Sequence, residues 1–265
     1  MKIGFIGAGK MAEAMIASLL KAGAAAPADI AASDVSEERR RAVAERYGVG
    51  VSADNAGVVA GAEIVVLAVK PQNLAEVLAQ IAPAVTPKHL VISIAAGKKI
   101  AGIEALIPGA RVIRVMPNVA CLIGEGMSAF AAGSRATAED RRTAAALLAS
   151  FGQAVELPEE QFDAVTALSG SGPAFFAYVL DRLAEAAVAE GLDRESAARL
   201  AAQTMLGTAR LLMEKRLPPR ELIAMVASPK GTTVAGLGVL DASPIGQILR
   251  DTISAAAKRS RELSG

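Results

Sequence analysis

The chain has 265 residues, which is enough for one large domain or two modest ones, and we expect two. Its 28 Lys and Arg residues against 27 Asp and Glu leave a formal net charge of +1, so the charge gives no reason to expect nucleic acid or an anionic membrane surface as a partner. Cys121 is the single cysteine, which excludes an intrachain disulfide, argues against a metal site and favours a reducing cytoplasm.

A glycine-rich turn lies close to the start of the chain. An apolar strand over residues 3–6 runs into Gly7-x-Gly9-x-x-Ala12 and then into a helix. Gly7 permits the tight turn, Gly9 lets the backbone approach a pyrophosphate, and Ala12 lets the helix pack on the strand. The N-terminus of that helix also favours an anion. A dinucleotide site is therefore predicted, with a purely structural turn as the alternative.

Short β-branched runs alternate with helical patterns up to about residue 115. This alternation predicts a parallel sheet with crossover helices and strands over residues 3–6, 30–33, 64–69, 90–94 and 112–115. The strand over 64–69 is apolar throughout, which predicts a place near the middle of the sheet. Two strands over 127–131 and 154–157, with a helix over 137–151 between them, are expected near the sheet edge. Residues 1–160 are thus predicted to form an NAD(P)-binding Rossmann-type domain.

Strand patterns are absent after residue 160. Helices are predicted over residues 173–190, 194–215, 219–227, 232–240 and 244–263, so residues 161–265 are expected to form an all-helical domain. Alanine recurs along the first of these helices and allows close packing of helices, either within one chain or between subunits. A symmetric homo-oligomer is the common state of such enzymes. The predicted fold class is α/β, with a Rossmann-type domain followed by an all-helical dimerisation domain.

The end of the second strand gives mixed evidence on the cofactor. Asp34 favours NAD, because an acidic residue at this point binds the ribose hydroxyls. Ser33 with the nearby Arg39 and Arg40 favours NADP, because a hydroxyl and arginines can accept the 2′-phosphate. The alternative for both arginines is a solvated helix face.

Other polar residues follow or precede the later strands. The loop from Ala68 to Pro71 and the turn from Ser93 to Gly97 are expected to border the cofactor cleft at the carboxyl ends of the strands. Asn118 could hydrogen-bond a carboxamide or cap a turn. His89 is the only histidine, and we expect a solvated side chain before a strand, on the far edge of the sheet, rather than a catalytic base.

Two segments rich in hydroxyl residues begin helices in the second half of the chain, at residues 169–175 and 228–233. In the second, Ser228, Gly231 and two threonines place hydroxyls and backbone N–H groups at a helix start, where they could converge on a carboxylate. An ordinary threonine-capped helix is the alternative. Beside a nicotinamide cleft, an anionic-substrate site is the better interpretation.

The chain resembles the pyrroline-5-carboxylate reductases, which make proline, over essentially its whole length. The motifs that carry the resemblance are Phe5–Met11, Ala68–Pro71, Arg111–Asn118, Leu168–Phe175 and Val226–Leu237, of which the last is the most specific. The resemblance implies NAD(P)H-dependent reduction of 1-pyrroline-5-carboxylate to L-proline by an intertwined homodimer or a larger assembly of dimers. NADPH is the expected cofactor and NADH the alternative, since Asp34 after Ser33 departs from the family pattern.

The resemblance also implies particular site residues. Cofactor binding is expected at Ile6, Gly7, Ala8, Gly9, Lys10, Met11, Ser33, Asn55, Ala68, Val69, Lys70, Pro71, Ile94, Ala95 and Ala96. The substrate carboxylate is expected at Ser228, Gly231, Thr232 and Thr233. Thr233 is the candidate catalytic residue, hydrogen-bonded to the ring nitrogen.

Two other functions remain open on the sequence. A 3-hydroxyacid dehydrogenase would share the architecture, but that family places a catalytic lysine where this chain has none between Lys99 and Lys215. A non-catalytic dinucleotide sensor would keep the glycine turn without needing the segment from Ser228 to Thr233.

Overall fold

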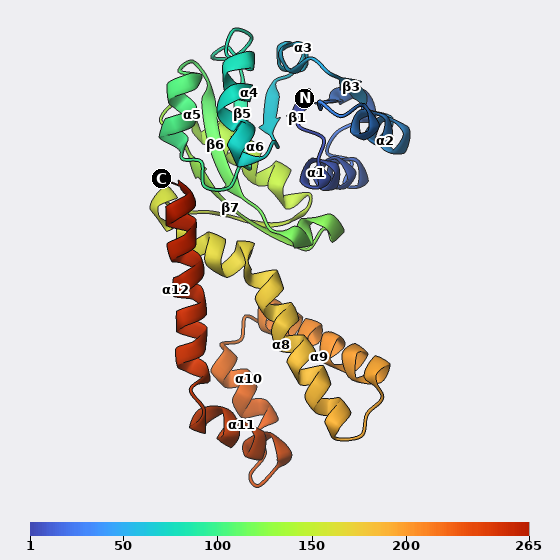
Figure 1. The fold of residues 1–265 in the computed structure, drawn as a ribbon, viewed down its shortest axis with the longest axis vertical. Helices are drawn as coiled ribbons and strands as arrows, with labels where there is room; N and C mark the ends of the chain where they lie inside the picture. Colours follow the sequence, from blue (N-terminus) through green and yellow to red (C-terminus); the bar gives the residue numbers. More distant parts are fainter. Residues whose placement is uncertain (265) are drawn as a thin grey trace. The chain divides into compact units, whose positions relative to one another are not determined.

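The structure is a computed structural model and describes residues 1–264. Its contacts divide the chain into two compact units (Figure 1): Met1–Ser171 together with the chain from Ala256 onward, and Gly172–Ala255. The expected boundary after residue 160 lies earlier than this division, because the chain that follows the sheet still packs on it. Phe162 is buried in the core of the first unit, and the Ser260 hydroxyl donates a hydrogen bond to Asp163 Oδ1 over 2.6 Å.

The first unit is built on one eight-stranded sheet with the order β3-β2-β1-β4-β5-β6-β7-β8. Only the pair β6–β7 is antiparallel among the pairings of the described residues. The predictions that β4 lies near the middle of the sheet and that β7 and β8 lie near its edge are confirmed, whereas β3 was not predicted. The strands are β1 (Ile3–Ile6), β2 (Ile30–Ser33), β3 (Gly50–Ser52), β4 (Ile64–Leu67), β5 (Leu90–Ser93), β6 (Arg111–Met116), β7 (Gly126–Ala132) and β8 (Gly152–Glu156).

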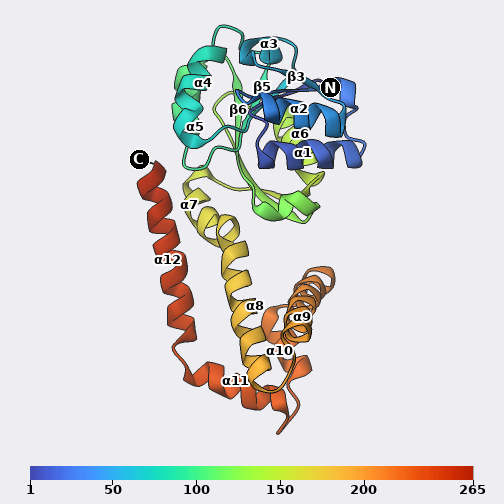
Figure 2. The same ribbon diagram turned by 45° about the vertical axis from the view of Figure 1, so that its right-hand side comes forward.

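Helices cover both faces of this sheet (Figures 1 and 2). One face packs against α1 (Lys10–Lys21), α2 (Glu37–Tyr47) and α6 (Ala138–Ala149). The other packs against α3 (Asn55–Ala60), α4 (Leu74–Ile81) and α5 (Ile100–Leu106). All four residues of β1, β4 and β5 are buried, because successive side chains point to opposite faces and each face is covered.

Short helical turns complete the first unit. They are η1 (Pro27–Asp29), η2 (Pro71–Asn73), η3 (Val119–Ile123), η4 (Glu159–Gln161), α7 (Phe162–Val165) and the π-helical η5 (Thr166–Gly170). The last three follow β8 and lead to the second unit. The predicted Rossmann-type α/β fold is confirmed for this part of the chain.

The second unit is entirely helical, as predicted. Its helices are α8 (Gly172–Ala189), α9 (Arg194–Lys215), α10 (Pro219–Val226), α11 (Thr232–Ala242) and the first part of α12 (Ile245–Ser264). Asp193 caps α9 by accepting a hydrogen bond from the backbone N–H of Ser196. None of the helices described over residues 1–264 is both long enough and apolar enough to cross a membrane.

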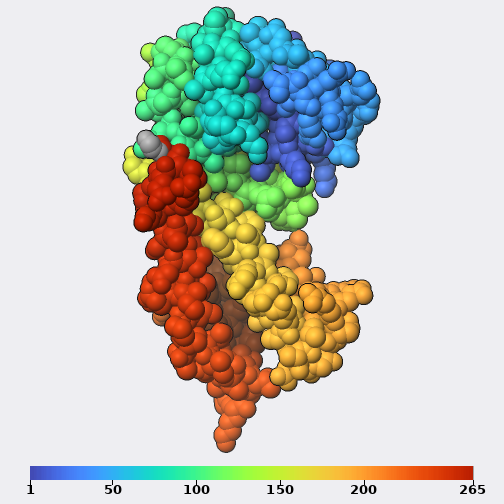
Figure 3. All heavy atoms as spheres, in the orientation of Figure 1, coloured from blue at the N-terminus to red at the C-terminus, as the bar shows by residue number. Residues whose placement is uncertain are grey.

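The second unit buries very little of itself. Gly172, Ala184 and Ala197 are its only buried residues, and large apolar side chains such as Val239 (71% exposed) and Phe176 (59%) face outward. In Figure 3, α8 (yellow) and α9 (orange) lie against each other on the visible face. Burial of apolar surface is the main force that stabilises a fold. A unit that leaves this much apolar surface exposed has little core of its own to stabilise it.

Candidate active site

The predicted cofactor residues gather at the carboxyl ends of neighbouring strands. Strands β2, β1, β4 and β5 are adjacent in the sheet, and the strand order reverses between β1 and β4. Such a reversal is where open α/β sheets bind their ligands. The loops there are joined by backbone hydrogen bonds: Gly7 N–H donates to Ser33 O and Ala68 N–H donates to Ile6 O, each over 2.8 Å.

The glycine turn fits a dinucleotide pyrophosphate. Gly7 has φ +98°, and a Cβ there would lie 2.8 Å from the carbonyl oxygen of Ala68, so this position requires glycine. Gly9 has no heavy atom within 4 Å of the place where a Cβ would stand. It is also the N-cap of α1 and no side chain caps that end, which leaves the N–H groups of Lys10 and Met11 available to an anion.

The remaining predicted cofactor residues lie on the neighbouring loops. Ala68 and Val69 follow β4, Lys70 and Pro71 begin η2, and the turn from Ile94 to Ala96 follows β5. Two of the residues are brought together directly, since the buried Ser33 hydroxyl donates to Asn55 Oδ1 over 2.6 Å.

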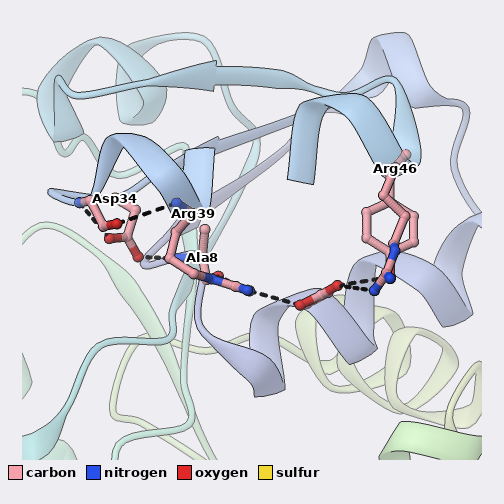
Figure 4. A network of polar contacts seen from close by, with 7 residues as sticks. Ala8, Asp34, Arg39 and Arg46 are labelled. Atoms are coloured by element: carbon pink, nitrogen blue, oxygen red, sulfur yellow. Dashed lines mark hydrogen bonds and ion pairs between the residues drawn. The ribbon is translucent and has the colours of Figure 1, made fainter. Parts of the chain in front are cut away.

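Asp34 and Arg39 turn toward the glycine turn (Figure 4). Asp34 Oδ2 accepts a hydrogen bond from the N–H of Ala8 over 2.8 Å, and Oδ1 accepts one from the N–H of Ser36 over 2.9 Å. Arg39 donates to the carbonyl oxygen of Ala8 from Nε and Nη2 over 3.0 and 2.7 Å. The interpretation of Arg39 as part of a solvated helix face is therefore wrong, because its side chain is only 33% exposed and bonds to the turn.

Glu13 is a residue of this network that the sequence reasoning missed. Its carboxylate, on α1, accepts from Arg39 Nη2 over 2.7 Å and from Arg46 Nη1 over 2.8 Å, with the Tyr47 hydroxyl at 3.3 Å. The hydrogen bond from Arg39 is the main reason why the pKa of Glu13 lies below its usual value. No local pattern predicts these contacts, because the partners lie 26 to 34 residues further along the chain.

The lowered pKa of Glu13 predicts a pH dependence of stability. A carboxylate with a lowered pKa stabilises the fold above its usual value of 4.5, and this contribution is lost as the pH falls through the lower pKa of the folded state. Glu13→Gln should reduce the free energy of unfolding by roughly 1.5–3 kcal/mol near pH 7, the scale of hydrogen bonds to charged groups. Denaturant titrations of both proteins should show the difference shrinking below about pH 4.5. A difference that stays constant down to pH 3 would contradict this account.

The predicted substrate residues form the turn between α10 and α11. Gly231 N–H donates to the carbonyl oxygen of Ser228 over 3.0 Å, and a Cβ at Gly231 would lie too close to the Ser228 hydroxyl, at 2.4 Å. Lys230 adopts φ +61° within this turn. Gly231 is the N-cap of α11 without a side-chain cap, so the predicted alternative of an ordinary threonine-capped helix is wrong. The exposed end of α11 can receive a carboxylate.

The two threonines of this segment differ in their surroundings. Thr232 is exposed, whereas Thr233 is half-buried and lines a hollow of about 600 Å³ between α9, α10 and α11. The hollow is mainly apolar, with Leu211, Ile223 and Leu237 among its walls. Ser228 and Gly231 are thus in direct contact, while Thr233 lies at the edge of an apolar surface.

Two residues that the sequence left open have structural roles. Asn118 caps η3, because its Oδ1 accepts from the N–H of Ala120 over 3.2 Å and also from Met127 over 3.3 Å. His89 is 6% exposed and its Nδ1 accepts from the N–H of Thr86 over 2.8 Å. The expectation of a solvated histidine is wrong, since this hydrogen bond holds the ring in the turn before β5. The expected place on the far edge of the sheet is wrong as well, because β5 lies between β4 and β6.

Arg114, on β6, also serves the fold. Its guanidinium pairs with Glu159 Oε1 over 2.8 Å and lies 4.6 Å from the centre of the Phe162 ring. The same Glu159 oxygen accepts from the N–H of Ile100 at the start of α5. The motif from Arg111 to Asn118 therefore joins β6 to the chain after β8.

A Rossmann-type domain with an open glycine turn, followed by a helical unit with little core, defines a two-domain dinucleotide-dependent oxidoreductase. Comparisons with known proteins agree. Residues 159–263 match the family described as pyrroline-5-carboxylate reductase dimerisation, and residues 2–97 match the family described as NADP oxidoreductase coenzyme F420-dependent. The chain belongs to the pyrroline-5-carboxylate reductase family.

Individual relatives cover nearly the full chain. Pyrroline-5-carboxylate reductase of Methanosarcina acetivorans is 46% identical over 99% of this chain and 97% of its own. The solved structure of a pyrroline-5-carboxylate reductase from Coxiella burnetii is 32% identical, with a TM-score of 0.95 over 100% of this chain and 98% of that one. The enzyme of Plasmodium falciparum, solved with NADP bound, is 27% identical, with a TM-score of 0.87 over 100% and 98%.

Proposed function

We propose that the protein reduces 1-pyrroline-5-carboxylate to L-proline with NADPH, and with NADH as the alternative cofactor. The observation that carries the proposal is that one chain has two helix N-termini without a side-chain cap, one suited to a pyrophosphate and the other to a carboxylate. One is the open glycine turn before α1, and the other is the turn from Ser228 to Gly231 before α11. Membership of the reductase family supports the same reaction.

Cofactor binding in this proposal uses the residues at the carboxyl ends of β1, β2, β4 and β5. The N–H groups of Lys10 and Met11 receive the pyrophosphate, since nothing caps them. Ser33 and Asn55, already hydrogen-bonded to each other, lie on the adenosine side. The loops at 68–71 and 94–96 border the nicotinamide.

Substrate binding uses the turn before α11. The Ser228 hydroxyl and the N–H groups of Gly231 and Thr232 hold the carboxylate, and the Thr233 hydroxyl holds the ring nitrogen. The nicotinamide supplies a hydride to the imine carbon. A protonated imine is already electrophilic, so positioning contributes much of the rate, up to about 7–11 kcal/mol in favourable cases. The reaction then needs no histidine base, which agrees with His89 being held in a buried turn.

Assembly into homodimers, and into larger assemblies built from dimers, is part of the proposal. The match to a dimerisation family and the sparse burial within Gly172–Ala255 support it. A cytoplasmic location is also proposed, because Cys121 is a free, buried thiol whose pKa is raised by burial, as suits a structural cysteine in a reducing compartment.

The proposed reaction can be tested by following the transferred hydrogen. NADPH with deuterium at the reactive face of C4 should give proline with one deuterium at the carbon that was double-bonded to nitrogen, detected by mass spectrometry. Deuterium in a 3-hydroxyacid and none in proline would instead identify a 3-hydroxyacid dehydrogenase.

Substitution of the two hydroxyl residues should affect different kinetic constants. Ser228→Ala should raise the substrate KM about tenfold or more, since a hydrogen bond to a charged group is worth roughly 1.5–3 kcal/mol. Thr233→Ala should lower kcat, because its bond strengthens as the ring nitrogen changes from imine to amine. NADPH affinity should stay nearly unchanged in both variants.

Ser243→Ala is the matched control for this pair. Ser243 is a half-buried serine before α12 whose hydroxyl donates to the carbonyl of Leu240, and its loss should leave the substrate KM unchanged. Equal, small effects of Ser228→Ala and Thr233→Ala on KM would mean that the backbone N–H groups hold the carboxylate unaided.

A further inference from the structure

The two peptide groups of Ala8 are held by side chains from the turn after β2 and from α2 (Figure 4). Asp34 accepts from its N–H, and Arg39 donates twice to its carbonyl oxygen. Ala8 itself is fully buried within the glycine turn. These contacts set the conformation of the backbone that precedes α1, and with it the direction of the uncapped N–H groups.

Glu13 holds the Arg39 side chain in place against the carbonyl oxygen of Ala8. The carboxylate of Glu13 is 17% exposed and pairs with Arg39 Nη2, which also bonds to Ala8. Arg46 holds the second oxygen of the same carboxylate. Two of the three nitrogens of the Arg39 guanidinium are therefore engaged in bracing the turn.

Arg40 is placed differently, although it is the next residue. Its Nη1 donates to the carbonyl oxygens of Asp34 and Val35 over 2.7 and 3.1 Å, at the turn that follows β2. Val35 is 95% exposed, so this turn lies at the surface. A guanidinium has five N–H donors, and those of Arg40 Nε and Nη2 have no partner among residues 1–264.

The turn after the second strand is where Rossmann-type domains meet the adenosine ribose, and a nearby arginine there accepts the 2′-phosphate of NADP. We propose that the consecutive arginines have separate tasks: Arg40 receives the 2′-phosphate, while Arg39, a positioning residue held by Glu13, fixes the glycine turn for either cofactor. Arg40 also offsets the negative charge of Asp34, which would otherwise repel that phosphate. The inference rests on the proposed use of a nicotinamide dinucleotide.

Direct binding of NADP⁺ and NAD⁺ to the full-length protein, measured by calorimetry at fixed ionic strength, separates the two tasks. Arg40→Gln should weaken NADP⁺ binding roughly tenfold to a hundredfold, the scale of lost hydrogen bonds to a charged group, with the Kd for NAD⁺ unchanged. Arg39→Gln should weaken both cofactors by similar factors and should lower the Tm of the unliganded protein more than Arg40→Gln does, because Arg39 also loses its ion pair with Glu13.

If Arg39→Gln does not fold, Glu13→Gln is a second variant that tests the positioning role of Arg39. It should weaken both cofactors by similar factors, without selectivity for the phosphate. A wild-type protein that binds both dinucleotides, with Arg40→Gln affecting both equally or neither, would overturn the division of tasks alone. Selective loss of NADP⁺ in Arg39→Gln would overturn it as well. A folded wild-type protein that binds neither dinucleotide would overturn both this inference and the proposed function.

Discussion

Replacing Gly9 with valine is expected to weaken NADPH binding by at least about a hundredfold, because its side chain would stand where the pyrophosphate approaches the N–H groups of α1. The free energy of unfolding of the unliganded protein should change by no more than about 1 kcal/mol. Gly9 has φ −69° and ψ 178°, which any residue can adopt, and open space at the position of a Cβ. Fluorescence titration with NADPH and denaturant unfolding measure the two quantities separately.

Gly7→Ala is the contrasting variant two residues earlier. Its φ of +98° and the 2.8 Å approach to Ala68 predict a loss of at least about 2 kcal/mol in the free energy of unfolding. Normal NADPH affinity in Gly9→Val would show that the turn is structural only, and would refute its assignment to the cofactor.

Charges placed on the helices of the second unit are expected to convert the dimer to monomers and abolish activity. Val239 on α11 and Ile248 on α12 are 71% and 56% exposed in the single chain. If a partner covers them, burial of each side chain contributes about 1.5–3 kcal/mol to the free energy of dimer formation. Each side chain occurs twice in a symmetric dimer. The double variant Val239→Asp with Ile248→Asp should raise the dimer dissociation constant at least about a thousandfold. Sedimentation velocity over a concentration series measures this shift.

Leu106→Asp is the control for that experiment. Leu106 ends α5 in the first unit and is 42% exposed, so it presents a similar apolar side chain outside the proposed dimer face. Its substitution should leave the sedimentation coefficient unchanged. A wild-type protein that is monomeric and fully active at assay concentration would contradict the role given to the second unit.

Local sequence patterns were sufficient for most of the elements. The strands at 3–6 and 30–33 and the helix at 194–215 match the structure at both ends. The strand at 3–6 has no polar side chain, and the helix is 22 residues long with Asp193 marking its start. Strand β3 was missed because three residues, Gly-Val-Ser, offer no periodicity from which to predict a strand.

Contacts between distant parts of the chain could not be predicted in the same way. The sequence indicated that Asp34 or Arg39 would meet the cofactor, but not that both would bond to Ala8, 26 and 31 residues earlier. Glu13 gave no signal at all, since an acidic residue in the first turn of a helix is common. The site residues themselves were proposed from motifs, and the structure adds which of them share hydrogen bonds, as Ser33 and Asn55 do.

The reductase reaction itself is tested most directly by the initial rate of NADPH and NADH oxidation with 1-pyrroline-5-carboxylate, with 1-pyrroline, which lacks the carboxylate, as the matched substrate. Turnover of the carboxylate substrate, with kcat/KM at least about tenfold lower for 1-pyrroline, is the predicted result, because the turn before α11 recognises the acid. No turnover of 1-pyrroline-5-carboxylate with either cofactor, by a folded and dimeric protein, would contradict it.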